Sequence, residues 1–248
     1  MPDDDTPIVE RVRISQIYRY AEAKQRGGEH GRRGDKSKQR CPEMTEDTAK
    51  PELGLRERNK RDKARRIREA ARELFLEKGF DAATTRQIAQ RADVGLGTLF
   101  SYVSDKRDLL FLIYNEDQPK LTKAAFEDVP PDMPLLDQLV GIFGFYYRFF
   151  AQQPELGRFL LRELTFYVDG DQAARFQSGR REIVDGIEAL VFRSRERGTI
   201  NTAEDSRMVA RIIFAVYQAE IRRWLQGNEP EAEAGLETLR RVLGMVFT

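Results

Sequence analysis

Histidine and cysteine are nearly absent from this 248-residue chain, which contains one of each. His30 lies in a polar stretch, so histidine does not serve as a general base in the folded part, and serine–histidine–aspartate triads are excluded. Cys41 alone makes neither a disulfide framework nor a cysteine-rich zinc site, and it fits a reducing compartment. No apolar run approaches the roughly 18 residues that span a bilayer, and the acidic start lacks an apolar signal core. The sequence predicts a cytoplasmic protein with no membrane partner, no metal site and no cofactor.

The net charge of +1 conceals an uneven distribution along the chain. Residues 1–55 hold 11 basic and 11 acidic side chains, residues 56–115 hold 14 and 9, and residues 116–248 hold 17 and 21. A basic segment followed by an acidic one indicates a polyanion-binding module joined to a second part. Local fluctuation of the charge is an equally good explanation until the motifs are considered.

Residues 1–55 carry few large apolar side chains, and glycines interrupt their middle part. Such a segment cannot offset the entropy lost on ordering, so we predict a disordered extension. Met44 lies just before the first periodic segment. We therefore hypothesise that the translation start was assigned too early and that the working protein begins near Met44.

A helical period of apolar residues begins after Arg56 and forms one stripe: Ile67, Ala70, Ala71, Leu74 and Phe75. This spacing predicts an amphipathic helix. Gly79 is a stop signal for that helix, and Phe80 is placed to fold back on its stripe. Thr84 or Thr85 can cap a second helix that ends near Ala92.

A tight turn at 93–95 separates this second helix from a third, predicted over 96–103 with Leu99 facing inward. A fourth helix is predicted from Asp105 to about Asp117. Further helices are expected at about 134–153, 154–170, 171–197, 203–226 and 230–247, because each begins or ends at proline, glycine or a capping residue. No sustained strand alternation occurs. The prediction is an all-α fold of about nine helices.

Two short helices joined by a tight turn form a helix-turn-helix. The stretch TTRQIAQRADVGLGTLFSYVSDKRDLL (84–110), with ARRIREAARELFLEKGFDAATT (64–85) before it, closely resembles the DNA-binding region of the TetR (tetracycline repressor-like) transcriptional regulators. The resemblance implies a helix-turn-helix DNA-binding domain at 61–121, with its motif at 84–103, and a helical effector-binding and dimerisation domain at 122–248. It also implies a homodimer, paired through its last two helices, on a pseudo-palindromic double-stranded operator.

A recognition helix must present small, polar or flat residues to the major groove. Gly97 permits close approach of the backbone, while Thr98 and Ser101 offer hydroxyl groups. The resemblance adds phosphate contacts from Tyr102, Lys106 and the start of the second helix. The candidate DNA-binding residues are Thr84, Thr85, Arg86, Gly95, Leu96, Gly97, Thr98, Phe100, Ser101, Tyr102 and Lys106.

The sequence departs from the usual family pattern at four of these positions, one of which is Ser101, where a larger side chain is usual. Gly95 and Leu96 replace a frequent Ser-Lys pair, and Phe100 stands where tyrosine is common. These changes affect operator sequence and affinity rather than the mode of binding. Residues 56–68 hold eight basic and two acidic side chains. We interpret them as an arm that adds phosphate contacts, with a solvated helix face as the alternative.

Residues 141–150 contain six aromatic side chains, more than one helix stripe needs. The resemblance implies an effector pocket here, although any single ring can equally belong to ordinary core. The aromatic bias favours a flat or lipophilic effector. The candidate pocket residues are Phe143, Tyr146, Tyr147, Phe150, Phe159, Arg162, Phe166 and Tyr167.

The last two predicted helices carry broad apolar stripes that we interpret as a dimer interface. Their members are Met208, Ile212, Ala215 and Ala219, then Leu236, Leu239, Leu243 and Val246.

The sequence predicts a ligand-responsive transcriptional regulator, most simply a repressor, and not an enzyme. An activator or a ligand-independent regulator is the first alternative. The second, from another class, is an enzyme or helical binding module that keeps the motif only for folding. The absence of a usable histidine, a phosphate loop and recognisably spaced carboxylates counts against an enzyme.

Overall fold

The computed structural model of the chain describes residues 54–246, except the side chain of Thr165. Residues 1–53 of the predicted disordered extension and the proposed start near Met44 lie outside the described residues, whereas Leu55, which we placed in the extension, is the first residue of a helix. The chain divides into two units, Met1–Lys60 and Arg61–Thr248. The buried hydrophobic residues of the described part belong to the second unit.

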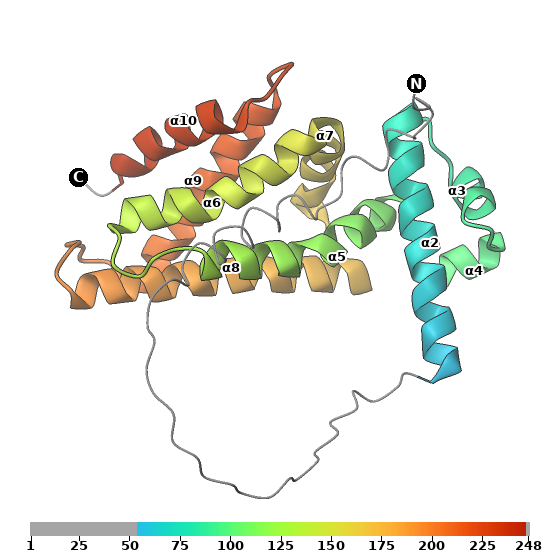
Figure 1. Cartoon of the computed structure of the whole chain (residues 1–248), viewed down its shortest axis with the longest axis horizontal. Coiled ribbons are helices and arrows are strands. Elements are labelled where there is room, and N and C mark those ends of the chain that lie inside the picture. Colours follow the sequence, from blue (N-terminus) through green and yellow to red (C-terminus); the bar gives the residue numbers. More distant parts are fainter. Residues whose placement is uncertain (1–53, 247–248) are drawn as a thin grey trace, which may run out of the picture. The chain divides into compact units, whose positions relative to one another are not determined.

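Helices supply the regular structure of residues 54–246 (Figure 1). They are α2 (Leu55–Lys78), α3 (Thr85–Arg91), α4 (Leu96–Phe100), α5 (Lys106–Glu127), α6 (Leu135–Gln152), α7 (Pro154–Glu163), the 3₁₀ turn η2 (Leu164–Phe166), α8 (Asp171–Glu196), α9 (Ser206–Leu225) and α10 (Ala232–Gly244). This part of the chain contains nine α-helices and no strand, so the all-α prediction is confirmed.

Two kinds of feature are missing from the described residues. None of their helices combines the length and apolar character needed to cross a membrane. They also contain no group of three histidine, cysteine or acidic side chains arranged to hold a metal ion.

The predicted stripe of α2 forms the core of the helix-turn-helix region. Its five residues are buried, and Ile88 of α3 and Leu99 of α4 are also buried, both at zero exposure. Gly79 ends the helix with φ of +78°, a conformation that glycine adopts without strain. The Phe80 ring then returns to within 5.2 Å of Phe75, measured between ring centroids. Both predictions for this helix end are confirmed.

The remaining helices form a larger bundle. Helices α5 and α8 run alongside each other, α6 lies against α10, and α9 contacts both α8 and α10 (Figure 1). The centre is aromatic: Phe111, Phe143, Tyr146 and Tyr147 are among the largest fully buried side chains. Arg72 of α2 ties the two regions together through a 2.7 Å ion pair with Asp117 of α5, whose carboxylate is largely buried.

Helix α5 is longer than the sequence predicts, because it continues past Asp117 to Glu127 through Pro119. An interior proline removes one backbone hydrogen bond and costs about 3 kcal/mol. Burial of Leu121 and Ala125 beyond the proline offsets that cost and keeps the chain helical. The boundary that we place between residues 121 and 122 therefore lies inside one continuous helix, and it remains a proposal.

The interpretation of the α10 stripe as an interface does not hold for three of its four members, and the fourth, Val246, is 37% exposed. Leu236, Leu239 and Leu243 are buried inside the chain, where α10 packs on α6 and α9. A Cβ at Gly235 would lie 2.5 Å from Tyr147 Cε1 and 2.7 Å from Trp224 Cδ1, so the close helix approach is intramolecular. The stripe on α9 differs, because Met208 and Ile212 remain about two-fifths exposed.

Candidate nucleic-acid interface and effector-binding region

Ion pairs hold the turn of the helix-turn-helix against α2. Arg66 donates to the carbonyl oxygen of Asp93 at 3.2 Å and to its carboxylate at 3.1 Å. Asp93 has φ of +50°, so the turn includes a left-handed residue that this arginine fixes from outside. Arg91 at the end of α3 binds Glu77 of α2 at 2.6 Å. The orientation of α3 and α4 is therefore set by charged contacts as well as by the core.

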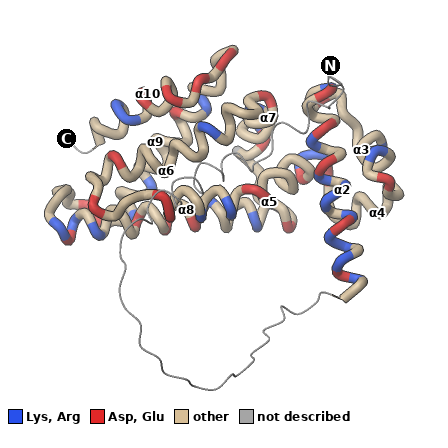
Figure 2. The backbone as a smooth tube through the Cα atoms, viewed as in Figure 1, with Lys and Arg blue, Asp and Glu red and all other residues tan. Residues whose placement is uncertain are grey.

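The basic segment before the motif is helical from Leu55 onward. Several of its charges are used within α2: Arg65 pairs with Asp62 at 2.6 Å and with Glu69 at 2.9 Å. Figure 2 shows Lys and Arg interleaved with Asp and Glu along α2. Residues 61–69 thus form a solvated helix face with ion pairs between neighbouring turns, which was the alternative to a DNA-binding arm. Arg66 binds Asp93 in the turn of the helix-turn-helix.

Thr84 caps α3 in a reciprocal arrangement. Its hydroxyl accepts from the backbone N–H of Gln87 at 3.2 Å, and the Gln87 side chain accepts from the backbone N–H of Thr84 at 3.1 Å. This capping box satisfies two backbone donors and fixes where the helix begins. Thr85 is half-buried and Arg86 is exposed in the same first turn. The predicted cap at Thr84 is confirmed.

Helix α4 presents a small and partly apolar outer face. A Cβ added at Gly97 would meet no other atom within 4 Å, and Leu96 and Phe100 are 37% and 47% exposed. Leu99 and Val103 point inward and are buried, while Thr98 and Tyr102 are half-buried. Gly95 precedes the helix without a side-chain cap, as its lack of a hydroxyl requires.

Helix α4 ends at Phe100, three residues earlier than predicted. The Ser101 hydroxyl donates to the carbonyl of Thr98 at 2.7 Å. The next backbone bonds, from Ser101 to Thr98 and from Tyr102 to Leu99, span three residues. Such bonds tighten the chain into a 3₁₀-like turn, which ends the α-helix.

Lys106, which the resemblance assigns to a phosphate, has intramolecular partners in this structure. Its ammonium group donates to the carbonyls of Phe80, Asp81 and Ala83 at 2.8, 3.1 and 3.3 Å, and it lies 4.5 Å from the Phe80 ring centroid. Because an ammonium has three donors, these bonds use its whole capacity. In this structure Lys106 fixes the loop between α2 and α3 and is not available to a phosphate.

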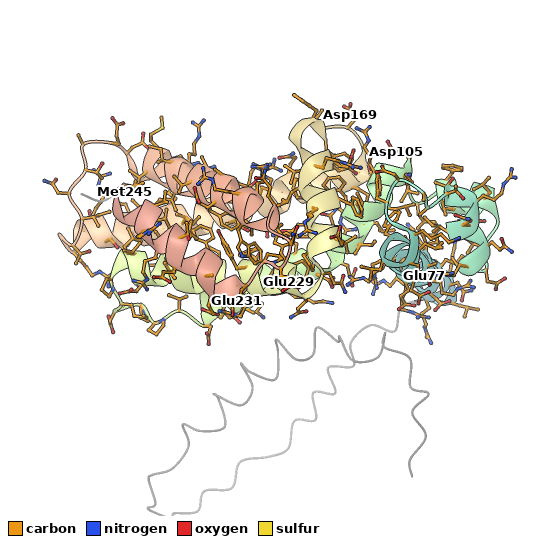
Figure 3. The ribbon with its side chains drawn as sticks, turned by 90° about the horizontal axis from the view of Figure 1, so that it is seen from above. Glu77, Asp105, Asp169, Glu229, Glu231 and Met245 are labelled. Carbon is orange, nitrogen blue, oxygen red and sulfur yellow. The ribbon has the colours of Figure 1, made fainter. Side chains whose placement is uncertain are left out.

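The start of α5 is joined to the loop before α8. Asp105 caps α5 by accepting from the N–H of Asp108 at 2.9 Å, and the Asp108 carboxylate accepts from the N–H of Ser104 at 2.7 Å. The other Asp108 oxygen accepts from the Tyr167 hydroxyl. Figure 3 labels Asp105 and Asp169, which mark the two chain segments that meet here.

Tyr167 is fixed by contacts of its ring and of its backbone carbonyl. Its ring stacks on Phe111 with centroids 3.6 Å apart, and its carbonyl accepts from the Gln177 side chain at 3.2 Å. Burial raises the pKa of the Tyr167 phenol, and Asp108 raises it further. The hydroxyl that we assigned to an effector is therefore committed to the junction between α5 and α8.

Four of the predicted pocket residues, on α6, belong to the aromatic core. Phe143 stacks on Tyr217 of α9 at 4.2 Å between centroids, and the Tyr146 hydroxyl lies 2.8 Å from Thr122 Oγ1. Tyr147 packs on Trp224 at 4.8 Å, yet its hydroxyl is buried without a partner in the described residues. Phe150 is also buried. Phe143, Tyr146 and Tyr147 thus lie beside rings of α9, whereas Phe150 lies beside Tyr114 of α5.

The other predicted pocket residues lie elsewhere. Phe159 of α7 is half-buried with its ring 5.8 Å from that of Phe80, and Phe166 is 86% exposed. Arg162 is exposed and pairs with Asp81 at 3.1 Å and Glu163 at 2.9 Å. The structure does not bring the eight predicted residues together around one cavity, because a composition bias does not record which element each ring faces.

A groove of about 610 Å³ lies between α8 and α9. Its walls contain five arginines: Arg180, Arg181, Arg207, Arg211 and Arg222. This volume is in the range of small-molecule sites, which is about 300–1,000 Å³. None of these arginines is among the sequence-predicted site residues. Arg207, Arg211 and Arg222, together with Gln218, nevertheless recur at helical spacing on one face of α9, and α8 carries an Arg-Arg pair.

Comparisons with known proteins agree with this description. Residues 67–113 match the family model described as bacterial regulatory proteins, tetR family. The fatty acid metabolism regulator protein of Bacillus subtilis is 23% identical over 175 residues, covering 69% of this chain and 88% of that protein. The transcriptional repressor KstR of Rhodococcus jostii is 28% identical over 167 residues, covering 66% and 74%.

The fold agrees with a solved structure of the same kind. The Thermus thermophilus repressor FadR, crystallised in complex with lauroyl-CoA, superimposes with a TM-score of 0.55 at 23% identity, covering 73% of this chain and 92% of that one. The matched segment contains α3 and α4 with the capped turn described here. Residues 67–113 therefore match the DNA-binding region of the TetR family of bacterial regulatory proteins, and the relatives that align over about two thirds of the chain are transcriptional regulators.

Proposed function

We propose that the chain is a homodimeric repressor that binds an operator through α3 and α4 and releases it when a small effector binds the helical bundle. The observation that carries the proposal is the outer face of α4, where Gly97 is open and Phe100 is exposed, on a turn fixed by Arg66 and Arg91. A rigidly held face of small and flat residues suits insertion into the major groove.

Five of the candidate DNA-binding residues then have distinct roles. Thr85 and Arg86 face the phosphates from the first turn of α3, and Thr98 reads a base edge from α4. Phe100 packs its ring on a sugar or a thymine methyl group. Lys106 acts indirectly, since its bonds to the α2–α3 loop hold the start of α3 in place.

Dimerisation is proposed to use the exposed stripe of α9. Met208 and Ile212 are 39% and 42% exposed, and Ala215 and Ala219 on the same face are also exposed. One helix-turn-helix contacts too few base pairs to specify a site, so two copies must present recognition helices about 34–36 Å apart. Because the α10 leucines are buried within the chain, we propose α9 as the main contributor to the dimer interface.

The effector class that we propose is an acyl-CoA thioester. The relatives include a fatty acid metabolism regulator, and the Thermus structure contains lauroyl-CoA. An aromatic core beside an arginine-rich groove offers this chain both an apolar and an anionic contact surface. The proposed activity is binding and release, with no catalytic step.

The experiment is a fluorescence anisotropy titration of DNA from upstream of the chain's own gene. We expect saturable binding by a dimer, with release on addition of lauroyl-CoA and none with lauric acid at the same concentration. Gly97→Leu should weaken specific binding about tenfold or more. Binding of unrelated duplexes with equal affinity would contradict the proposal of operator recognition, and indifference to lauroyl-CoA would contradict the proposed effector.

A further inference from the structure

The groove between α8 and α9 is strongly basic and has no acidic residue among the described residues of its walls. Arg207 alone among its five arginines has carboxylate partners, Asp185 and Glu188. Within residues 54–246, no carboxylate lies within ion-pair distance of the other four, which are Arg180, Arg181, Arg211 and Arg222. Figure 2 shows basic residues spaced along α8. Four of the five positive charges of the groove therefore have no ion-pair partner in the described part of the chain.

Arg180 is the best-positioned of these side chains. Its guanidinium lies between two rings, 5.8 Å from the centroid of Phe176 and 5.3 Å from that of Phe214. Burial lowers the pKa of Arg180, and the nearby charge of Arg222 lowers it further. Both effects mean that the free site holds a guanidinium short of counter-charge, which a bound anion would supply.

Two further side chains of the groove, those of Arg222 and Gln218, are placed to contact a ligand. Arg222 donates to the carbonyl of Gln218 at 2.8 Å, which fixes its direction along α9. The side-chain oxygen of Gln218 is buried and has no partner in the described residues. A buried acceptor without a donor carries a free-energy cost that a ligand amide or amine N–H would remove.

One lining residue of the groove, Phe214, also belongs to the aromatic core. Phe214 contributes to the groove and lies 5.9 Å from Tyr217, measured between centroids. Tyr217 in turn stacks on Phe143. A ligand with an anionic head and an apolar tail could therefore contact arginines and aromatic rings at the same time.

We propose that this groove binds the phosphate groups of the effector, with guanidinium groups of α8 and α9 as their ligands. Guanidinium forks match phosphate oxygens in two-point, charge-assisted hydrogen bonds. The inference rests on the proposed repressor function, and it assigns the nucleotide end of an acyl-CoA to these residues. Binding of this end would draw α8 and α9 together across the groove.

The test compares three proteins by calorimetric titration with coenzyme A lacking an acyl group and with adenosine 3′,5′-bisphosphate. Arg181→Gln/Arg211→Gln removes two exposed charges that have no carboxylate partner in the described residues, so folding should be unaffected. Arg193→Gln, exposed on the same helix but outside the groove, is the matched control. We expect both ligands to bind the wild type and the control, and to bind the double variant about tenfold or more weakly. Circular dichroism melting checks that all three are folded.

The outcomes separate this inference from the proposed function. If lauroyl-CoA releases operator from wild type and double variant at equal concentrations, the groove assignment is overturned and the repressor function stands. If coenzyme A and the bisphosphate bind the wild type but not the double variant, and lauroyl-CoA does not release operator, the anion site is supported and the proposed effector is wrong. If the double variant loses its dimer mass without any ligand, the groove is a subunit contact and the inference is wrong.

Discussion

Replacement of Tyr167 by phenylalanine tests the junction between the DNA-binding region and the helical bundle. The change removes one hydroxyl and keeps the ring that stacks on Phe111. Asp108, which is 4% exposed, loses one of its two hydrogen-bond partners and keeps the N–H of Ser104. A hydrogen bond to a charged group is worth about 1.5–3 kcal/mol.

This loss can be converted into a shift of the melting temperature. For a protein of this size each kcal/mol changes the melting temperature by about 2–4 °C, so the expected decrease is roughly 3–12 °C. The assay is differential scanning fluorimetry at one protein concentration, followed by operator titration with and without lauroyl-CoA. Because Asp108 also holds the N–H just before α5, the ratio of operator affinities with and without effector should fall as well.

Tyr147→Phe is the matched control. It removes a buried hydroxyl that has no partner in the described residues, so its stability should stay unchanged or rise by about 1 kcal/mol. Equal melting temperatures for the two variants would refute the role of the Tyr167–Asp108 bond. A large destabilisation of Tyr167→Phe with an unaltered effector response would refute only its role in coupling.

Three further substitutions test other parts of the account. Gly97→Leu should leave the melting temperature unchanged or raise it, because its Cβ enters open space in a helix, while operator affinity in an anisotropy titration falls about tenfold or more. Lys106→Met should lower the melting temperature by a few degrees and leave the slope of affinity against salt concentration almost unchanged, since its ammonium binds backbone carbonyls; a slope smaller by about one unit would restore the phosphate role. Gly235→Ala should destabilise the chain by about 1–3 kcal/mol in urea unfolding, because its Cβ would crowd Tyr147 and Trp224, and a neutral result would mean that α10 packs differently.

Local signals in the sequence were sufficient for the helix-turn-helix. The stripe from Ile67 to Phe75, the stop at Gly79 and the cap at Thr84 each depend on residues within one or two helical turns. Such features are encoded by neighbours along the chain, and they predicted most helix boundaries to within a few residues. Helix α5 is an exception, because the burial that sustains it past Pro119 comes from residues on other helices.

The candidate sites were harder to predict, because they depend on contacts between distant segments. Lys106 finds its partners 23 to 26 residues earlier, and Tyr167 finds Asp108 59 residues earlier. The spacing of the α10 leucines fits either a dimer interface or the core of one chain. They are core residues because α6 packs on α10, and the sequence does not show where α6 lies. The arginines of the groove form one periodic stripe on α9, but their counterparts on α8 could not be paired with it from spacing alone.

The central claim is that effector binding and operator binding oppose each other in one protein. The direct measurement is calorimetric titration of lauroyl-CoA into the full-length dimer, first alone and then saturated with its operator. Thermodynamic linkage requires operator to weaken effector binding by the same factor by which effector weakens operator binding, about 5- to 150-fold for ordinary coupling. Equal lauroyl-CoA affinities in the two titrations would contradict the account and leave the helical bundle with dimerisation as its only role.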